Sequence, residues 1–424
     1  MVLIPIDGTS ALQVQSVSPM RRRGSWRGRL PRPLRTVTAV VVVALLAAAC
    51  GGSAVNQSDG AATEAESETL KVGLLVPLSG PYAAIGEDVK RGFELYLDQH
   101  DGELGGRSVE LVVADEGASP ATGIPAAQRL VNQDQVAVVA GIVSSAVAGG
   151  VRDIFDGAKI PLVLSVAAAS GEPSEYIWRT SQTTGQPGSA LGPHLAKQDL
   201  KSIYIIAADY VAGRQNVGAF ADAYRKAGGT IAGESYTPFG QTQDWQPYLA
   251  SIKQSGASAV YAFYAGAEAV RFVQQYDAFG LKESIPLYGT GFLTENDVLP
   301  AQGEAARDVY TSNNYSTEID TPENKAFISA YTGLYDTVPS GYSVQAYDSA
   351  KLIDEAASAA DAGLTSATLV AAMKEIDQLD SPRGTFAFDE NNNPVQQFYL
   401  RRVAASDGGF VNDVIEDLGS VPAS

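Results

Sequence analysis

Apolar segments of strand length alternate with amphipathic segments of helical spacing from residue 70 onward, and this alternation limits the possible folds more than any other feature. Strands are predicted at residues 71–77 (KVGLLVP), 109–114, 136–141 and 161–165. Helices are predicted between them at residues 83–99, 124–132 and 145–155. Strands that are apolar throughout are typical of a parallel sheet with helices on both faces.

The alternation then restarts and predicts a second unit of the same kind. Its strands are expected at residues 202–207, 231–236, 259–263 and 286–288, and its helices at 211–227, 245–255 and 267–279. A third stretch is mostly helical, at residues 322–335, 342–361 and 366–376, with Thr321 as an N-cap before Pro322. Two strands are expected at the end, at residues 384–389 and 396–403. The fold class predicted is α/β, with two doubly wound parallel-sheet lobes.

The first 49 residues have the pattern of an export signal. Seven arginines precede an apolar run, residues 36–49, which is too short for the roughly 20 residues that span a bilayer. Cys50, the only cysteine, follows small residues and resembles the acylated cysteine of a bacterial lipobox, although Ala47 stands where leucine is usual. The alternatives are an ordinary signal peptide or a membrane-spanning anchor. Met1 and Met20 are both plausible start residues.

The part of the chain after the signal is acidic. The whole chain has a net charge of −18, and removal of seven arginines and Asp7 leaves about −24 on 375 residues. This charge argues against nucleic acid as a partner and against adhesion to anionic lipid. Residues 51–69 are small and polar and are expected to form a tether from the lipidated Cys50 to a body of two domains. We expect an extracytoplasmic monomer on the outer face of the cell membrane.

Motifs of metal, nucleotide and covalent chemistry are missing from the sequence. His100 and His194 stand far apart, and no G-x-S-x-G, S-x-x-K, Walker A or G-x-G-x-x-G motif is present. The carboxylate pairs at residues 115–116 and 389–390 fall in turns, where solvated side chains are expected. The sequence therefore favours a protein that is not an enzyme and needs no metal or cofactor.

The loops that follow the predicted strands carry the candidate ligand-binding residues, because open α/β sheets bind ligands at the carboxyl ends of their strands. Two hydroxyls at a helix N-terminus, Ser144 and Ser145, suit a carboxylate, although one of them could be only an N-cap. Small residues at 165–170 permit close approach of the backbone. Aromatic residues could enclose an apolar ligand or pack in the core. The candidates at strand ends are Tyr82, Ser144, Ser145, Ala167, Ala169, Tyr210, Tyr264, Thr290 and Phe292.

Several of these segments resemble the leucine/isoleucine/valine-binding branch of extracytoplasmic solute-binding proteins. They are VGLLVPLSGPYAAIGEDVKRGFELYLDQ at residues 72–99, GIVSSAV at 141–147, IWRTSQTTGQ at 177–186, ADYVAGR at 208–214 and Ala-Gly-Ala-Glu at 265–268. The similarity extends from about Leu70 to Val403. It implies the type I periplasmic binding protein fold, in which two lobes joined by a three-segment hinge close on a ligand and deliver it to an ABC permease.

The resemblance also implies domain boundaries and residue roles. The lobes are expected at residues 70–182 with 315–392 and at 183–314 with 393–424, after a signal peptide at 1–49 and a lipidated tether at 50–69. The crossings are expected near residues 182–184, 313–315 and 392–395. Ser145 matches the family's carboxylate-binding serine, Ala167 a backbone contact, and Tyr210 a cleft tyrosine. Thr184 stands where amino-acid binders have a hinge aspartate.

Two departures from the family pattern bear on the ligand. Ala169 replaces a threonine that helps to hold the ligand, and Gly291 stands where amino-acid binders place a glutamate against the α-ammonium. A buried ammonium without a counter-charge is costly. The sequence therefore favours a small carboxylate, a class that includes aromatic acids. A branched-chain amino acid is the runner-up, with Asp209 or Glu268 as its remaining candidate counter-charges. A ligand-sensing receptor without transport is the other alternative.

Overall fold

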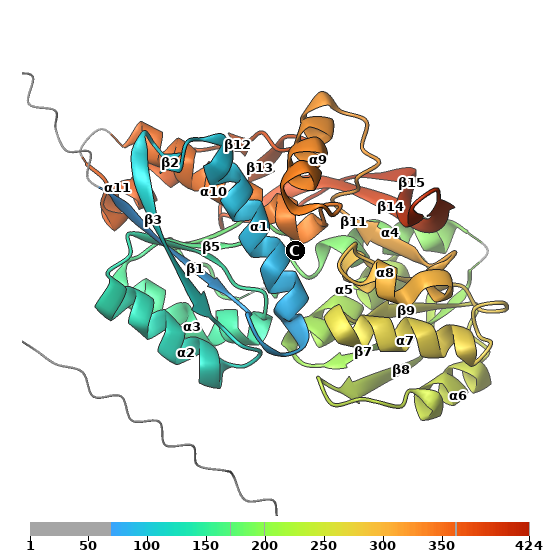
Figure 1. The fold of residues 1–424 in the computed structure, drawn as a ribbon. Coiled ribbons are helices and arrows are strands. Elements are labelled where there is room, and N and C mark those ends of the chain that lie inside the picture. Colours follow the sequence, from blue (N-terminus) through green and yellow to red (C-terminus); the bar gives the residue numbers. More distant parts are fainter. Residues whose placement is uncertain (1–68, 170, 199, 361–362, 424) are drawn as a thin grey trace, which may run out of the picture. The chain divides into compact units, whose positions relative to one another are not determined.

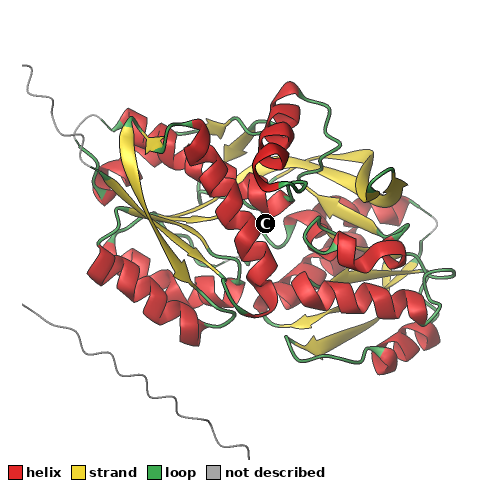
Figure 2. Ribbon diagram, in the orientation of Figure 1, coloured by secondary structure: helices red, strands yellow, loops and turns green. Residues whose placement is uncertain are grey.

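The structure is a computed structural model that describes residues 69–169, 171–198, 200–360 and 363–423, all of which belong to one compact unit. The predicted signal peptide, Cys50 and the tether up to residue 68 lie outside the described residues. None of the described helices is long and apolar enough to cross a membrane. The described residues form two sheets, each with helices packed against it (Figures 1 and 2).

The first sheet has six strands in the order β2-β3-β1-β4-β5-β6. Its strands are β1 (Leu70–Val76), β2 (Glu103–Leu104), β3 (Arg107–Asp115), β4 (Val138–Gly141), β5 (Leu162–Leu164) and β6 (Ile177–Arg179). All its pairs are parallel except the short β2–β3 hairpin; Leu74 of β1, for example, lies between Val113 and Ala140. The predicted parallel sheet is therefore confirmed for this part of the chain.

Helices cover both faces of this sheet, as the apolar strands require. On one face lie α1 (Ala83–Gln99), α10 (Gly341–Ala359) and α11 (Ser366–Met373), and on the other lie α2 (Pro120–Arg129), η2 (Leu130–Asp134) and α3 (Ser145–Ala158). The helix α1 approaches α10 so closely that a Cβ at Gly92 would lie 2.0 Å from the Ser343 carbonyl oxygen. Helix α9 (Pro322–Tyr335) packs beside α1, and Thr321 caps it as predicted.

The second sheet has nine strands in the order β12-β13-β14-β11-β10-β9-β7-β8, with β15 paired to β14. The parallel strands are β7 (Ser202–Asp209), β8 (Thr230–Pro238), β9 (Ala259–Phe263), β10 (Leu287–Thr290) and β11 (Tyr310–Asn313). The antiparallel strands are β12 (Gln378–Leu379), β13 (Phe386–Phe388), β14 (Pro394–Ser406) and β15 (Gly409–Val421). The predicted α/β class is confirmed, with an antiparallel part added at one side of the second sheet.

Helices also lie on both faces of the second sheet. The buried side chains of α5 (Val211–Lys226) join one core cluster together with those of α4 (Gln186–Lys197). The buried side chains of α6 (Gln246–Ser255) and α7 (Gly266–Ala278) form a separate cluster on the other face. The short helices are η1 (Gly80–Tyr82), η3 (Gly291–Leu293), α8 (Leu299–Gln302) and η4 (Gly303–Ala306).

The three segments expected to cross between the lobes meet at one buried side chain, Gln396. Its carboxamide oxygen accepts a hydrogen bond from Asn314 Nδ2 at 2.8 Å and another from Arg383. Its nitrogen donates to the Ser181 carbonyl oxygen at 2.9 Å and to Gln186 Oε1 at 3.1 Å. The segments near residues 181, 314 and 396 are therefore joined by one fully bonded amide group.

Candidate functional site

A small cavity with about 20 Å³ of free space lies where loops from the carboxyl ends of both sheets meet. The first sheet contributes the loops after β1, β4 and β5, and the second sheet contributes those after β7, β9 and β10. Strand ends of α/β sheets are where such folds bind ligands. The lining residues are Tyr82, Ile85, Val143, Ser145, Val166, Ala168, Tyr210, Ala212, Phe263, Ala265 and Phe292.

The loop between β4 and α3 has an unusual backbone, which directs its serines. Gly141 has φ +114°, and a Cβ there would lie 2.3 Å from the Leu75 carbonyl oxygen. Ile142 has φ 58°, a conformation that strains a β-branched residue. The next two amides, those of Val143 and Ser144, donate to the carboxylate of Glu116 at 2.8–3.1 Å. Glu116 therefore holds the strained loop in place.

This role of Glu116 differs from the solvated turn expected from the sequence. Glu116 is 0 % exposed, and its burial raises its pKa from the usual 4.5 to about 8, although the hydrogen bonds from the two backbone amides oppose the rise. The loop amides of Val143 and Ser144 are thus occupied by the protein's own carboxyl group, and they are not free for a ligand. The usable signal in the sequence was the position of Glu116, directly after β3 at the ligand-binding edge.

The hydroxyl of Ser145, the first residue of α3, faces the cavity from this loop. Its Oγ accepts hydrogen bonds from the amides of Ala168 at 3.3 Å and Ala169 at 3.1 Å. Both acceptor positions are therefore filled, and none of the described residues accepts the hydroxyl proton. Ser145 is consequently a hydrogen-bond donor toward the cavity, which suits an anionic oxygen.

Aromatic rings from both sheets form much of the remaining wall. The hydroxyl oxygens of Tyr82 and Tyr210 lie 3.2 Å apart and join the two sides of the cavity. Phe239 stacks behind Tyr210 with ring centroids 4.4 Å apart. Phe263 and Phe292 pack edge to face at 5.7 Å. Rings that meet from several directions are suited to enclosing a flat apolar body.

No charged side chain is among the residues described as lining this cavity. Glu268 is the nearby acid, but it is buried behind the aromatic wall and accepts the amide of Gly240 at 2.9 Å. Its burial raises its pKa to about 7. At Gly291 a Cβ would lie 2.3 Å from the side chain of Asn313, so this position has no room for a glutamate. The cavity therefore offers hydroxyls and rings, and it offers no carboxylate for an ammonium group.

The structure brings together four of the residues expected at the site, namely Tyr82, Ser145, Tyr210 and Phe292. The other six do not line the cavity. Ser144 caps α3, Ala167 and Thr184 are buried beside the wall, and Thr290 is buried at the end of β10. Tyr264 points into the other face of the second sheet, where its hydroxyl lies 3.1 Å from Thr237 Oγ1. Ala169 lines a neighbouring cavity.

Sequence reasoning did not select several lining residues. Phe263, the neighbour of Tyr264, faces the cavity, because successive residues of a strand point to opposite faces. Phe239, which does not line the cavity but stacks behind Tyr210, lies in the loop after β8 and could not be assigned without the fold. The apolar residues Ile85, Val143 and Val166 looked like ordinary core residues in the sequence.

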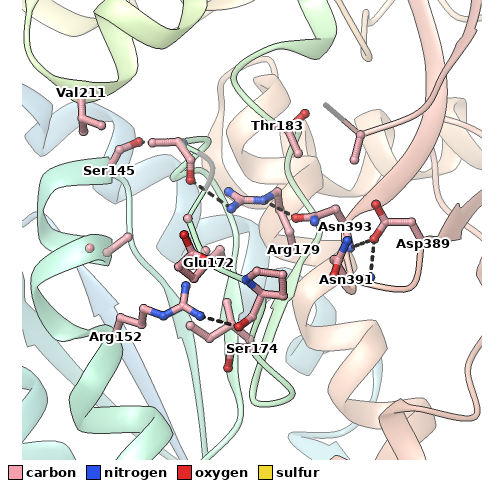
Figure 3. A pocket seen from close by; sticks show the side chains of 18 of the residues that line it. Ser145, Arg152, Glu172, Ser174, Arg179, Thr183, Val211, Asp389, Asn391 and Asn393 are labelled. Atoms are coloured by element: carbon pink, nitrogen blue, oxygen red, sulfur yellow. Dashed lines mark hydrogen bonds between the residues drawn. The ribbon is translucent and has the colours of Figure 1, made fainter.

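A second, wider cavity, which Figure 3 shows, shares Ser145 with the first. Arg152, Glu172 and Ser174 lie on one side of it, and Asp389, Asn391 and Asn393 lie on the other side. Arg179 lies between these groups and donates from Nε to Asn393 Oδ1 at 3.1 Å. In the described part of the chain, no group of His, Cys, Asp or Glu side chains could hold a metal ion.

Comparisons with known proteins agree with this architecture. Residues 69–409 match the family model described as periplasmic binding protein. The chain is 34% identical over 365 residues to "Leu/Ile/Val-binding protein homolog 6" of Brucella melitensis, which covers 84% of this chain and 93% of that protein.

Solved structures of ABC-transporter solute-binding proteins from R. palustris are similar as well. One, in complex with benzoate, is 33% identical and has a TM-score of 0.78. Another, in complex with 4-hydroxybenzoate, is 32% identical with the same TM-score. Each covers 84% of this chain, and this chain covers 98% of each. The match over most of the chain in sequence and in structure shows that the protein belongs to the periplasmic binding protein family.

Proposed function

We propose that this protein is the solute-binding component of an ABC importer and that it captures a small aromatic carboxylate. The observation that carries the proposal is the cavity itself, in which aromatic rings surround a hydroxyl donor and no charged side chain is present. The benzoate and 4-hydroxybenzoate complexes of similar proteins support the same ligand class. The role needs no metal or cofactor, because the hydroxyl of Ser145 at the N-terminal end of α3 provides a donor for the carboxylate.

A branched-chain amino acid is the second candidate, because the curated relatives are named for leucine, isoleucine and valine binding. Its carboxylate and apolar side chain would suit Ser145 and the rings. Its ammonium group would be buried without a carboxylate partner, since Glu268 lies behind the wall and is bonded to Gly240. A buried charge without a partner is strongly unfavourable. This cost favours the aromatic acid.

Isothermal titration of ligand-free protein distinguishes the two candidates. Benzoate, 4-hydroxybenzoate and leucine would each be titrated into protein that was unfolded, dialysed and refolded to remove bound solute. We expect tight binding of an aromatic acid and weak or no binding of leucine. Tight leucine binding without aromatic-acid binding would contradict the proposal.

We further propose that the lobes follow the family pattern, with crossings near residues 182–184, 313–315 and 392–395, and that ligand shifts them toward closure. Cys50 would be acylated and would anchor the protein outside the cell membrane. Mass spectrometry of the N-terminal peptide tests the anchor: a diacylglyceryl group on Cys50 is expected, and an unmodified Cys50 or an intact residue 49–50 bond would contradict it.

A further inference from the structure

Arg179 is a buried arginine beside the candidate site whose charge has no carboxylate partner within ion-pair distance among the described residues. The residue is 6 % exposed. The other two buried arginines of the described chain each have such a partner, Arg383 with Asp348 at 2.8 Å and Arg401 with Glu295 at 3.0 Å. Burial lowers the pKa of Arg179 to about 10, against the opposing effect of the Asp389 charge, and this leaves Arg179 charged at neutral pH. Its positive charge is therefore available to stabilise an anion.

The hydrogen bonds of Arg179 lead toward Ser145. One terminal nitrogen donates to the carbonyl oxygen of Ala167, and the other donates to that of Ala169 at 3.3 Å. The Ala167 carbonyl belongs to the same peptide group as the Ala168 amide, which donates to Ser145 Oγ at 3.3 Å. Two hydrogen bonds in series therefore connect the guanidinium, through one peptide group, to the hydroxyl oxygen of Ser145.

A second peptide group reaches the same oxygen from the hinge. The Thr184 amide donates to the Ala168 carbonyl oxygen at 2.7 Å, and the Ala169 amide of that peptide group donates to Ser145 Oγ at 3.1 Å. Hydrogen bonds in series polarise one another, so both peptide groups make the Ser145 hydroxyl a stronger donor. Only the series that begins at Arg179 starts from a full charge, and hydrogen bonds to charged groups are the stronger kind.

We propose that Arg179 is a positioning and specificity-determining residue that provides the positive counter-charge for a ligand carboxylate, transmitted through the Ala167–Ala168 peptide group and Ser145 without direct contact. This inference rests on the proposed function in its choice of ligand. The effect of the Arg179 charge on the hydroxyl of Ser145, which is the electrostatic part of the proposal, is a property of the protein alone and does not depend on the ligand. A small anion would thus be favoured over a neutral molecule of the same shape, although the cavity wall carries no charge.

The electrostatic part can be measured without any ligand. The substitution Ser145→Cys in the full chain carrying Cys50→Ser introduces a single thiol, whose ionisation is followed by thiolate absorbance against pH. Adding Arg179→Gln keeps a donor but removes the charge, and should lower the acid ionisation constant of the thiol roughly tenfold. Adding Arg179→Lys keeps the charge and should restore most of the acidity. Arg152→Gln, in the wider cavity that Arg179 also lines, is the matched control and should change the acidity of the thiol little.

The ligand part is measured as the ratio of benzoate to benzamide affinity in protein with the native Ser145. Arg179→Gln should reduce this ratio roughly tenfold, Arg179→Lys should largely preserve it, and Arg152→Gln should leave it unchanged. Equal loss of affinity for both molecules would mean that Arg179 only supports the fold, and would overturn the proposal. Thiol acidity that does not respond to Arg179→Gln would overturn it too.

The two measurements separate the two proposals. If the unaltered protein binds no aromatic acid, the proposed ligand class fails, and the thiol measurement alone decides whether the charge of Arg179 reaches position 145.

Discussion

Neighbouring serines have different roles at the start of α3. Ser144 is the N-cap, with its Oγ 3.5 Å from the Val147 amide, whereas Ser145 directs a hydroxyl into the cavity. The sequence allowed both roles for this pair but did not distinguish them, because the distinction depends on the left-handed backbone of Ile142 just before them. The strain at that residue is fixed by Glu116 and Leu75, which are distant in sequence.

Replacement of Ser145 by alanine tests its role as a donor. Ser145→Ala removes the hydroxyl that donates to the ligand and leaves a buried carboxylate oxygen unpaired, so ligand affinity should fall by about 1–3 kcal/mol. Titration calorimetry with the preferred aromatic acid measures the loss. Ser144→Ala is the matched control: it should reduce the free energy of unfolding by about 0.5–2 kcal/mol through the lost cap, with a much smaller effect on affinity. Unchanged affinity in Ser145→Ala would show that Ser145 does not hold the ligand carboxylate.

Glu116 should make the stability of the protein depend on pH. Because its pKa is raised from 4.5 to about 8, the native state binds this proton more tightly than the unfolded chain does. The resulting stability is complete below about pH 4.5 and is lost as the pH rises toward about 8, by at most about 1.4 kcal/mol per pH unit.

Glu116→Gln keeps an acceptor for the loop amides but cannot ionise. We expect the variant to gain stability relative to the unaltered protein as the pH rises from 5 to 9, measured by urea unfolding at each pH. Stability curves that stay parallel over this range would show that Glu116 does not titrate as its burial indicates.

At the scale of elements, the sequence predicted the helices and strands that carry strong apolar periodicity and missed those that do not. Strands β1, β3 and β4 of the first sheet and the helices α1 and α2 between them lie close to their predicted positions, whereas the short β2 was not predicted. Helix α4 was missed because its sequence, QPGSALGPHLAK, contains glycine and an internal Pro193. Strand β15 was missed because many of its residues are exposed or half-buried, and it is held mainly by backbone pairing to β14.

A glycine at the start of α7 allows the two sides of the cavity to approach each other closely. Gly266 has φ +54°, and a Cβ there would lie 2.7 Å from the Pro81 carbonyl oxygen in the loop after β1. Gly280, just after the same helix, has φ +76° and no neighbour within 4 Å of a built Cβ. The two glycines therefore share the backbone requirement but differ in the space around them.

Alanine at these two glycines separates backbone strain from steric obstruction. Gly266→Ala and Gly280→Ala should each cost about 1–2 kcal/mol of stability, because both place a Cβ on a left-handed residue. Only Gly266→Ala should also reduce ligand affinity, by tenfold or more, since its methyl group pushes against Pro81. Calorimetry and urea unfolding measure the two effects. Equal affinities in both variants would show that the contact between Gly266 and Pro81 is not needed for binding.

At the scale of the whole molecule, the alternation of strands and helices was sufficient to predict two sheet-and-helix units, but not how the chain connects them. The helical stretch packs on the first sheet through α10 and α11. After it, β13 pairs with β14 in the second sheet, and β12 pairs with β13. The connection is buried and polar, so hydrophobic periodicity carries no information about it. Gln396 lies at its centre.

Removal of the Gln396 amide should therefore weaken the connection between the two sheets. Gln396→Leu keeps a side chain of similar volume but removes the partner of four buried groups: the Asn314 amide, the Arg383 guanidinium, the Ser181 carbonyl and the Gln186 side chain. Unpaired buried polar groups cost about 1–3 kcal/mol each, so we expect a loss of about 2–4 kcal/mol in the free energy of unfolding after partial rearrangement.

Gln397→Leu, on the next residue, is the matched control. The Gln397 amide bonds at the surface to Asp417, so its loss should cost less than about 1 kcal/mol. Urea unfolding followed by tryptophan fluorescence measures both, with Trp178 in the first sheet and Trp245 beside the second as reporters. Equal stability of the two variants would show that the three segments are held together by packing and not by the shared amide.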